Sequence, residues 1–266
     1  AARELGIETV AVYSTADKEA LHTLLADEAV CIGPAKSTES YLNMNAVLSA
    51  AVLTGSEAIH PGFGFLSENS KFATMCEEVG IKFIGPSGSV MDMMGDKINA
   101  RAQMIKAGVP VIPGSDGEVH SAEEALKVAD RIGYPVMLKA SAGGGGKGIR
   151  KVERAEDLVP AFESASTEAK AAFGNGAMYL ERVIYPARHI EVQILADQCG
   201  HVVHLGERDC SLQRNNQKVL EESPSVAIGK TIRDQIGSAA VRAAESVGYE
   251  NAGTIEFLYD EGKGEF

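Results

Sequence analysis

The chain has 266 residues, which is enough for one large domain or for two to three smaller ones with sizeable cores. Its 37 acidic and 25 basic residues give a net charge of −12, which disfavours general nucleic-acid binding because such binding needs a basic surface. The charge does not exclude an anionic ligand, since a few placed lysines and backbone amides can cradle phosphate.

The sequence also bears on membrane insertion and on the redox compartment. No apolar run approaches the roughly 20 residues that a membrane-spanning helix needs, and no signal peptide opens the chain. The cysteines lack zinc-finger or CxxC spacing, so we expect free thiols and a cytoplasmic protein.

The N-terminal part alternates short apolar strands with helices. Helices are predicted over 41–54 and 71–79, and strands over 9–13, 29–32, 58–59 and 82–84. This alternation predicts a parallel sheet with helices on its faces. Proline and glycine residues over 110–117 then predict a loop or linker.

A second unit is predicted to begin at Ser121, which forms a capping box with Glu124 for a helix ending near Gly133. Its further elements are expected as strands over 136–141, 149–152 and 178–184 and a helix over 157–173.

A third unit begins with a strand over 188–197, in which polar and apolar residues alternate. A tight turn at 198–200, a strand over 201–205, a helix over 231–247 and a strand over 253–259 are expected to follow, in the manner of an α+β fold.

Both ends of the chain have unfinished patterns. Residues 1–6 predict the tail of a helix stopped by Gly6, and residues 260–266 predict a hairpin turn without its return strand. We therefore expect a fragment, or a chain with further residues at both ends.

The most distinctive segment is the glycine-rich stretch 139–148, in which Lys139 and Lys147 flank four consecutive glycines. The four are Gly143, Gly144, Gly145 and Gly146. Such a run leaves the backbone free to turn its N–H groups towards phosphate oxygens. The pattern is neither a P-loop nor a dinucleotide fingerprint. A mobile lid over a nucleotide and a plain flexible turn are the two interpretations.

Two further segments carry candidate polar groups. His189, Glu191 and Gln193 share one face of a strand, which is either solvated or functional. The segment 207–218 is dense in hydrogen-bonding side chains, and its Arg214 and Lys218 could hold a small anion, although a solvated loop would look similar.

One carboxylate, Glu256, lies on the last complete strand and is either solvent-facing or a ligand for Mg²⁺. The histidines other than His189 have no metal spacing, and no serine or cysteine nucleophile motif is present.

Taken together, these segments resemble the biotin carboxylase family of ATP-grasp enzymes over essentially the whole chain. The matching stretches are 60–69, 94–97, 133–148, 188–193, 207–211, 217–218 and 253–256. The resemblance implies an N-terminal parallel α/β domain followed by an ATP-grasp fold with a mobile glycine-rich lid. The implied divisions are 1–94, a linker and helix over 95–120, a lid subdomain over 121–184, and an incomplete subdomain over 185–266.

The resemblance also implies the reaction, in which ATP activates bicarbonate to a carboxyphosphate and biotin on a carrier protein is then carboxylated. The implied cofactors are ATP and Mg²⁺, with Mn²⁺ as an alternative, and carrier-bound biotin is the substrate. The implied partners are a biotin carboxyl carrier protein or domain, a carboxyltransferase component and a second copy of the full-length chain, and fatty acid biosynthesis is an implied process. No nucleic acid and no membrane is expected.

The residues to which the resemblance assigns roles fall into four groups: phosphate contacts, nucleotide contacts, the bicarbonate and biotin site, and the metal. The phosphate contacts are Lys97, Lys139, Gly143, Gly144, Gly145 and Gly146, and the nucleotide contacts are Glu181, Arg182, Val183, Ile184, His189 and Asn216. The bicarbonate and biotin site has the catalytic candidates Lys218 and Glu191 together with Gln213, and the metal ligand is Glu256.

Some positions depart from the family pattern. Phe63 stands where the family often has Tyr, and Asn216 stands where a His can occur, which leaves the ligand contacts there open. A second metal carboxylate and a catalytic arginine would lie beyond Phe266, so we expect this chain alone to be unable to complete the reaction. The alternatives are another ATP-grasp ligase, such as a carbamoyl-phosphate or purine-pathway enzyme, and a non-catalytic nucleotide-binding or subunit-contact module.

Overall fold

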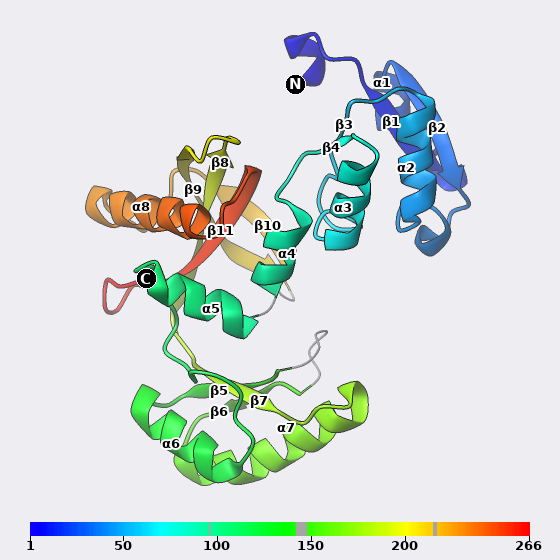
Figure 1. Ribbon diagram of the computed structural model, residues 1–266. Coiled ribbons are helices and arrows are strands. Elements are labelled where there is room, and N and C mark those ends of the chain that lie inside the picture. The colour runs from blue at the N-terminus through cyan, green and yellow to red at the C-terminus, as the bar shows by residue number, and fades with distance from the viewer. Residues whose placement is uncertain (96, 142–147, 215–216) are drawn as a thin grey trace. The chain divides into compact units, whose positions relative to one another are not determined.

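A computed structural model describes residues 1–95, 97–141, 148–214 and 217–266 (Figure 1). The chain divides into two compact units. Unit 1 contains residues 1–95, 194–203 and 247–253, and unit 2 contains residues 96–193, 204–246 and 254–266. None of the helices that the structure describes is both long and apolar enough to cross a membrane.

Unit 1 consists of short strands and helices in alternation. Its strands within residues 1–95 are β1 (Val10–Ser14), β2 (Glu28–Gly33), β3 (Ala58–Ile59) and β4 (Lys82–Phe83). Its helices there are η1 (Ala2–Leu5), η2 (Thr15–Asp17), α1 (Leu21–Leu25), η3 (Ser37–Glu39), α2 (Met44–Leu53), α3 (Ser70–Glu78) and α4 (Gly88–Gly95). The four predicted strands and two predicted helices are confirmed, whereas the short helices α1 and α4 were missed.

The strands of unit 1 pair in parallel, as the βα alternation predicts. β1 pairs with β2 and β3 pairs with β4, so the described strands form two separate pairs rather than one continuous sheet. Helix α3 is fixed at its start by Asn69, whose side chain accepts a hydrogen bond from the Phe72 N–H. Phe72, Ala73 and Cys76 of α3 are then buried in the core of this unit.

The first half of unit 2 is a three-stranded antiparallel sheet covered by two helices. Its elements are α5 (Lys97–Lys106), α6 (Ala122–Ile132), β5 (Val136–Ala140), β6 (Arg150–Val152), η4 (Ala155–Asp157), α7 (Leu158–Phe173) and β7 (Met178–Arg182). The strand order is β6-β5-β7, and Figure 1 shows α6 and α7 on the same face of the sheet. The predicted N-cap is confirmed, because Ser121 accepts from the Glu124 N–H, whereas the Glu124 side chain accepts from the N–H of His120, one residue before the N-cap.

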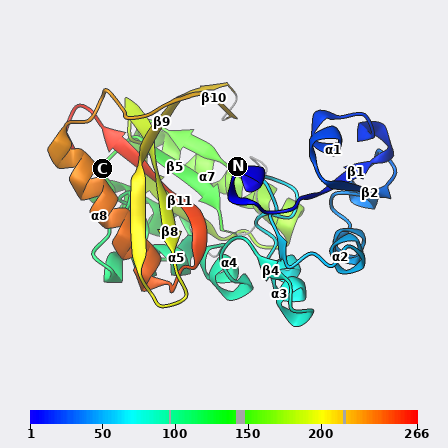
Figure 2. The ribbon, with the colours of Figure 1, turned by 90° about the horizontal axis from the view of Figure 1, so that it is seen from above.

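The second half of the chain forms a four-stranded sheet in the order β10-β9-β8-β11. Its elements are β8 (Ala187–Ala196), β9 (Val202–Arg214), β10 (Gln217–Glu222), α8 (Lys230–Ser246) and β11 (Asn251–Asp260). Helix α8 lies along the sheet, where a Cβ on Gly237 would come within 2.6 Å of the His204 ring (Figure 2). A larger residue at position 237 would therefore require the exposed His204 ring to move.

The alternation predicted for β8 is present, with Ile190, Val192 and Ile194 buried on one face. The interpretation of 207–218 as a solvated loop is wrong, because β9 continues to Arg214 and β10 follows it. Glu207 and Asp209 are buried there in spite of their charge, since ion pairs and hydrogen bonds compensate them. The predicted turn after β11 is present, with Asp260 bridging Glu265.

Candidate active site

The first cluster of candidate residues lies on the sheet of β5, β6 and β7. Burial alternates along β5, so the side chain of Lys139 lies on the face opposite to the buried Leu138. The Lys139 Nζ atom lies 2.5 Å from an oxygen of Glu181 and 5.6 Å from the centre of the Tyr179 ring. Burial opposes protonation of Lys139, but the hydrogen bond and charge of Glu181 outweigh it and raise the lysine pKa. The result is a fixed positive charge, partly exposed to a ligand.

The backbone that follows Glu181 is held from both sides. The Arg182 N–H donates to the carbonyl of Pro113 at 2.8 Å, and the Val183 N–H donates to the carbonyl of Pro135 at 2.8 Å. Arg182, Val183 and Ile184 are each half-buried. This segment therefore provides a fixed edge on which a planar group could lie beside Lys139.

The second cluster takes one charged side chain from each strand of the four-stranded sheet. Glu191 of β8 is only 5% exposed, and Arg208 of β9 donates from Nε to one of its oxygens at 2.5 Å. Lys218 of β10 donates to the other oxygen of Glu191. It also donates to Glu256 of β11 at 2.6 Å. We call these four residues the sheet-face cluster.

Both central members of the sheet-face cluster are ionised near neutral pH. Burial raises the pKa of Glu191, but Lys218 and Arg208 lower it by more, so the net pKa is below its usual range. Burial likewise lowers the pKa of Lys218, and Glu191 and Glu256 outweigh that effect and raise it. The cluster therefore presents a fixed ammonium group between two carboxylates.

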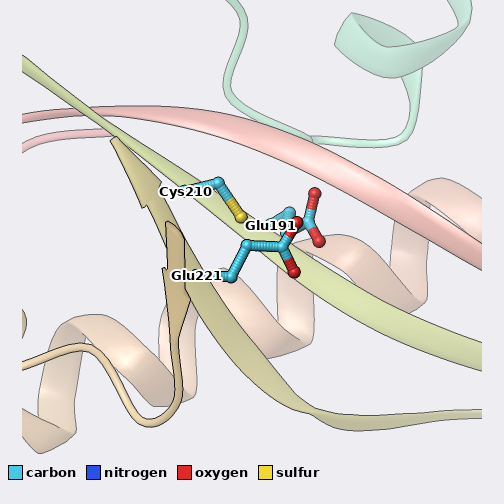
Figure 3. Close-up of side chains that lie close together, drawn as sticks. All are labelled: Glu191, Cys210 and Glu221. Atoms are coloured by element: carbon cyan, nitrogen blue, oxygen red, sulfur yellow. The ribbon is translucent and has the colours of Figure 1, made fainter. Parts of the chain in front are cut away.

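Beside this cluster, Glu191, Cys210 and Glu221 point towards one another, with ligand-type atoms within 4.8 Å (Figure 3). Burial, with the negative charge of both glutamates, raises the pKa of the Cys210 thiol to about 11. Arg208 weighs against a resident metal ion there, because it already lies 2.5 Å from Glu191 and 3.7 Å from Glu221. The carboxylates here are neutralised by side chains instead.

Glu256, the predicted metal ligand, has a different environment. Its side chain is 63% exposed, and one of its oxygens accepts a hydrogen bond from Lys218. Mg²⁺ in nucleotide sites commonly takes only one or two carboxylates, together with phosphate oxygens and water. An exposed, oriented carboxylate fits that requirement.

Two further candidates are held along the strands by hydrogen bonds. The His189 N–H donates to the Ser211 hydroxyl at 3.0 Å, and that hydroxyl donates to Asp209 at 2.5 Å. The Gln213 side chain donates to the Cys210 carbonyl at 3.0 Å, which holds it along β9. Gln213 is also the strand partner of Lys218, whereas the bond of His189 fixes its backbone on β8, two residues before Glu191.

The structure leaves several predicted phosphate and nucleotide contacts untested. Lys97 lies at the start of α5, but its side chain is outside what the structure describes. The predicted contacts that lie outside the described residues altogether are Gly143, Gly144, Gly145, Gly146 and Asn216. The predicted glycine-rich lid therefore stays a prediction. Arg214, the other candidate anion contact of the segment 207–218, is exposed at the end of β9.

One member of the sheet-face cluster, Arg208, had no role in the sequence interpretation. It lies inside the segment 207–218 that the polar composition singled out, but nothing in a single sequence marked it apart from its neighbours. Its position opposite Glu191 depends on the pairing of β8 with β9. A strand interpretation of 207–214 would have placed alternate side chains, including Arg208, on one face.

Comparison with known proteins assigns this geometry to a family. Residues 1–91 match the family described as biotin carboxylase, N-terminal domain. Residues 96–266 match the family described as carbamoyl-phosphate synthase L chain, ATP binding domain. The chain belongs to the biotin carboxylase family. Its fold is accordingly that of a biotin carboxylase with an ATP-grasp domain.

Curated and solved biotin carboxylases are similar along the whole chain. Biotin carboxylase 1 of Bacillus subtilis is 57% identical over 260 residues, which cover 98% of this chain and 58% of that protein. A structure of the Campylobacter jejuni biotin carboxylase in a β-γ-ATP complex has a TM-score of 0.87 at 52% identity, covering 98% of this chain and 58% of the other.

A third comparison is with the biotin carboxylase domain dimer of Hydrogenobacter thermophilus 2-oxoglutarate carboxylase, solved with MgADP, ADP and bicarbonate. It has a TM-score of 0.84 at 50% identity and covers 98% of this chain and 57% of that one. The chain therefore spans somewhat more than half the length of the biotin carboxylases it matches.

Proposed function

We propose that this chain carries the nucleotide-binding and bicarbonate-binding residues of an ATP-dependent biotin carboxylase. In this reaction ATP activates bicarbonate to a carboxyphosphate, and biotin on a carrier protein then accepts the carboxyl group. The observation that carries the proposal is the Lys218 ammonium, which is fixed between Glu191 and Glu256 by hydrogen bonds. Such a group can hold a small anion next to a carboxylate suited to Mg²⁺.

The two clusters would bind different parts of the Mg–ATP complex. Lys139, charged and fixed by Glu181, would contact phosphate oxygens, and the held backbone at Glu181–Ile184 would line the adenine. His189 would reach the nucleotide from β8. Mg²⁺ held by Glu256 would neutralise charge on the transferring phosphoryl group. The roles that stay predictions are those of Lys97, Gly143, Gly144, Gly145 and Gly146 at the phosphates and of Asn216 at the nucleotide.

Around bicarbonate, the side chains of this chain bind and orient. Lys218 would donate to a bicarbonate oxygen, and the buried carboxylate of Glu191 would hold that ammonium in place from behind. Gln213, held along β9, would lie near the bicarbonate and biotin. Charge-assisted hydrogen bonds are strong, so oriented donors of this kind would stabilise the negative charge that develops in the transition state of phosphoryl transfer.

The proposal extends to partners and location. A biotin carboxyl carrier protein or domain would bring the biotin, a carboxyltransferase component would take the product onward, and the full-length protein would form a homodimer. A cytoplasmic location accords with four cysteines that are all free thiols.

The test is the dependence of ATP cleavage on both co-substrates in the full-length protein. We expect ADP release to require bicarbonate and to rise with free biotin, and Lys218→Met to remove the response to bicarbonate. ATP cleavage that is indifferent to biotin but responds to another acceptor, such as ammonia, would support a different ATP-grasp ligase. Calorimetric titration with Mg–ATP separates a further alternative, because binding without any cleavage would indicate a non-catalytic nucleotide module.

A further inference from the structure

Arg208 divides its hydrogen bonds between two neighbouring side chains of β8. Its Nε donates to Glu191 at 2.5 Å, and its Nη1 donates to the Gln193 carbonyl oxygen at 3.3 Å. The same Nε lies 3.7 Å from an oxygen of Glu221 on β10. A planar guanidinium with several donors in a fixed fork suits this arrangement, and a lysine would keep the positive charge but lose the fork.

The two oxygens of Glu191 are therefore shared between two cations, one held by Arg208 and the other by Lys218. The Lys218 ammonium has three N–H donors. Two of them go to Glu191 and Glu256, which leaves the third for an incoming anion.

Removing Arg208 would change this balance in two ways. Glu191, 5% exposed, would have Lys218 as its remaining cationic partner among the contacts described, and would hold that ammonium more strongly. The charge on Glu191, Glu221, Glu256, Arg208 and Lys218 would also fall from −1 to −2, because three carboxylates would face one cation. Both effects oppose the binding of an anion at Lys218.

We propose that Arg208 is a positioning residue that neutralises and orients Glu191, so that Lys218 can give a hydrogen bond to bicarbonate. This inference rests on the proposed function of Lys218 as the bicarbonate contact. Arg208 touches no substrate in this scheme, and it acts through its contact with Glu191 and through the positive charge that it adds to the cluster.

The same strand offers a matched control. Glu207, next to Arg208 on β9, pairs with Arg233 of α8 at 2.7 Å. The exposed fractions of the side chains are 31% and 4% for Arg233 and Glu207, against 29% and 7% for Arg208 and Glu191. The two pairs thus differ little in burial, but only the pair of Arg208 and Glu191 includes a carboxylate that also binds Lys218.

The experiment compares Arg208→Met with Arg233→Met in the full-length protein, with urea unfolding and the KM values for bicarbonate and for ATP as readouts. We expect both variants to lose stability, since each leaves a buried carboxylate without its arginine, and Arg233→Met to lose at least as much because Arg233 also donates to the carbonyls of Ser225 and Ile228. Only Arg208→Met should raise the KM for bicarbonate, by about tenfold or more, with the KM for ATP within about twofold of the parent value.

Arg208→Lys completes the test because it keeps the charge and loses the fork. We expect Arg208→Lys to reverse at least half of the rise in the KM for bicarbonate, on a logarithmic scale. If Arg208→Met does not fold, the KM of Arg208→Lys is compared directly with that of the parent protein. An unchanged KM for bicarbonate in Arg208→Met, an equal rise in Arg233→Met, or no recovery in Arg208→Lys would each overturn the role of Arg208. A parent protein without bicarbonate-dependent ATP cleavage would instead contradict the proposed function.

Discussion

The two carboxylates bound to Lys218 should contribute very different amounts to stability, although both accept short hydrogen bonds from it. Glu191 is 5% exposed, whereas the side chain of Glu256 is 63% exposed. Water screens an exposed ion pair and solvates its partners when the pair is broken, but it does so poorly for a buried carboxylate. Burial, rather than hydrogen-bond length, should therefore decide the energies.

The perturbations are Lys218→Met, Glu191→Gln, Glu256→Gln and the two double variants that include Lys218→Met. An exposed pair typically contributes about 0.5 kcal/mol, which is our expectation for the coupling of Lys218 to Glu256. Breaking a fully buried pair costs about 3–5 kcal/mol, and the partial exposure of Lys218 (31%) brings our expectation for its coupling to Glu191 down to about 2 kcal/mol.

The assay is urea unfolding of the full-length protein followed by far-UV circular dichroism. Double-mutant cycles then give each coupling energy, provided that the slope of free energy against urea is the same in all variants. A coupling of Lys218 to Glu256 that equals or exceeds the coupling to Glu191 would refute the reasoning.

Three further predictions concern other parts of the chain. Leu138→Ala should cost about 2–5 kcal/mol of unfolding free energy, measured by the same urea assay, because this side chain is 0% exposed in a packed core; a loss below about 1 kcal/mol would contradict that packing. The hydrogen bond and charge of Asp197, 2.8 Å away, raise the pKa of His201, and His201 in turn lowers the pKa of Asp197. The pair should therefore stabilise the turn fully between about pH 4 and pH 6.5, and lose its effect as the pH rises through the raised histidine pKa or falls through the lowered aspartate pKa. NMR titration should show the imidazole pKa falling in Asp197→Asn, and an unchanged value would count against the pair. Iodoacetamide at pH 8 should modify exposed Cys199 well before Cys210, whose thiol is buried with a pKa of about 11, and equal rates by peptide mass spectrometry would disprove this difference.

Where local chemistry decides the structure, the sequence was sufficient. The N-cap at Ser121 and the alternation of β8 were both predicted, because each depends on residues a few positions apart. The parallel pairing of the N-terminal strands followed from the order of strands and helices.

What the sequence could not supply was the pairing that buries charge. The strand predicted over 201–205 stops short of the observed end of β9 at Arg214, and Glu207, Arg208 and Asp209 have the polarity of a solvent-exposed loop. Their burial depends on partners in β8 and α8 that lie far away in the chain, and polarity alone carries no information about such partners. β10 was missed for a related reason, since nearly all of its residues are exposed and show no alternation in burial.

Strand β9 carries separate ionic partners on its two faces. Glu207 and Asp209 bind Arg233 and Ser225, while Arg208, between them in sequence, binds Glu191. A slip of one residue in the pairing of β9 would exchange the two faces and bring arginine towards arginine and carboxylate towards carboxylate. In most sheets the hydrophobic pattern prevents such a slip, whereas in this strand electrostatic repulsion would do so. Errors in strand pairing during folding should therefore be most frequent at high salt, where this repulsion is screened.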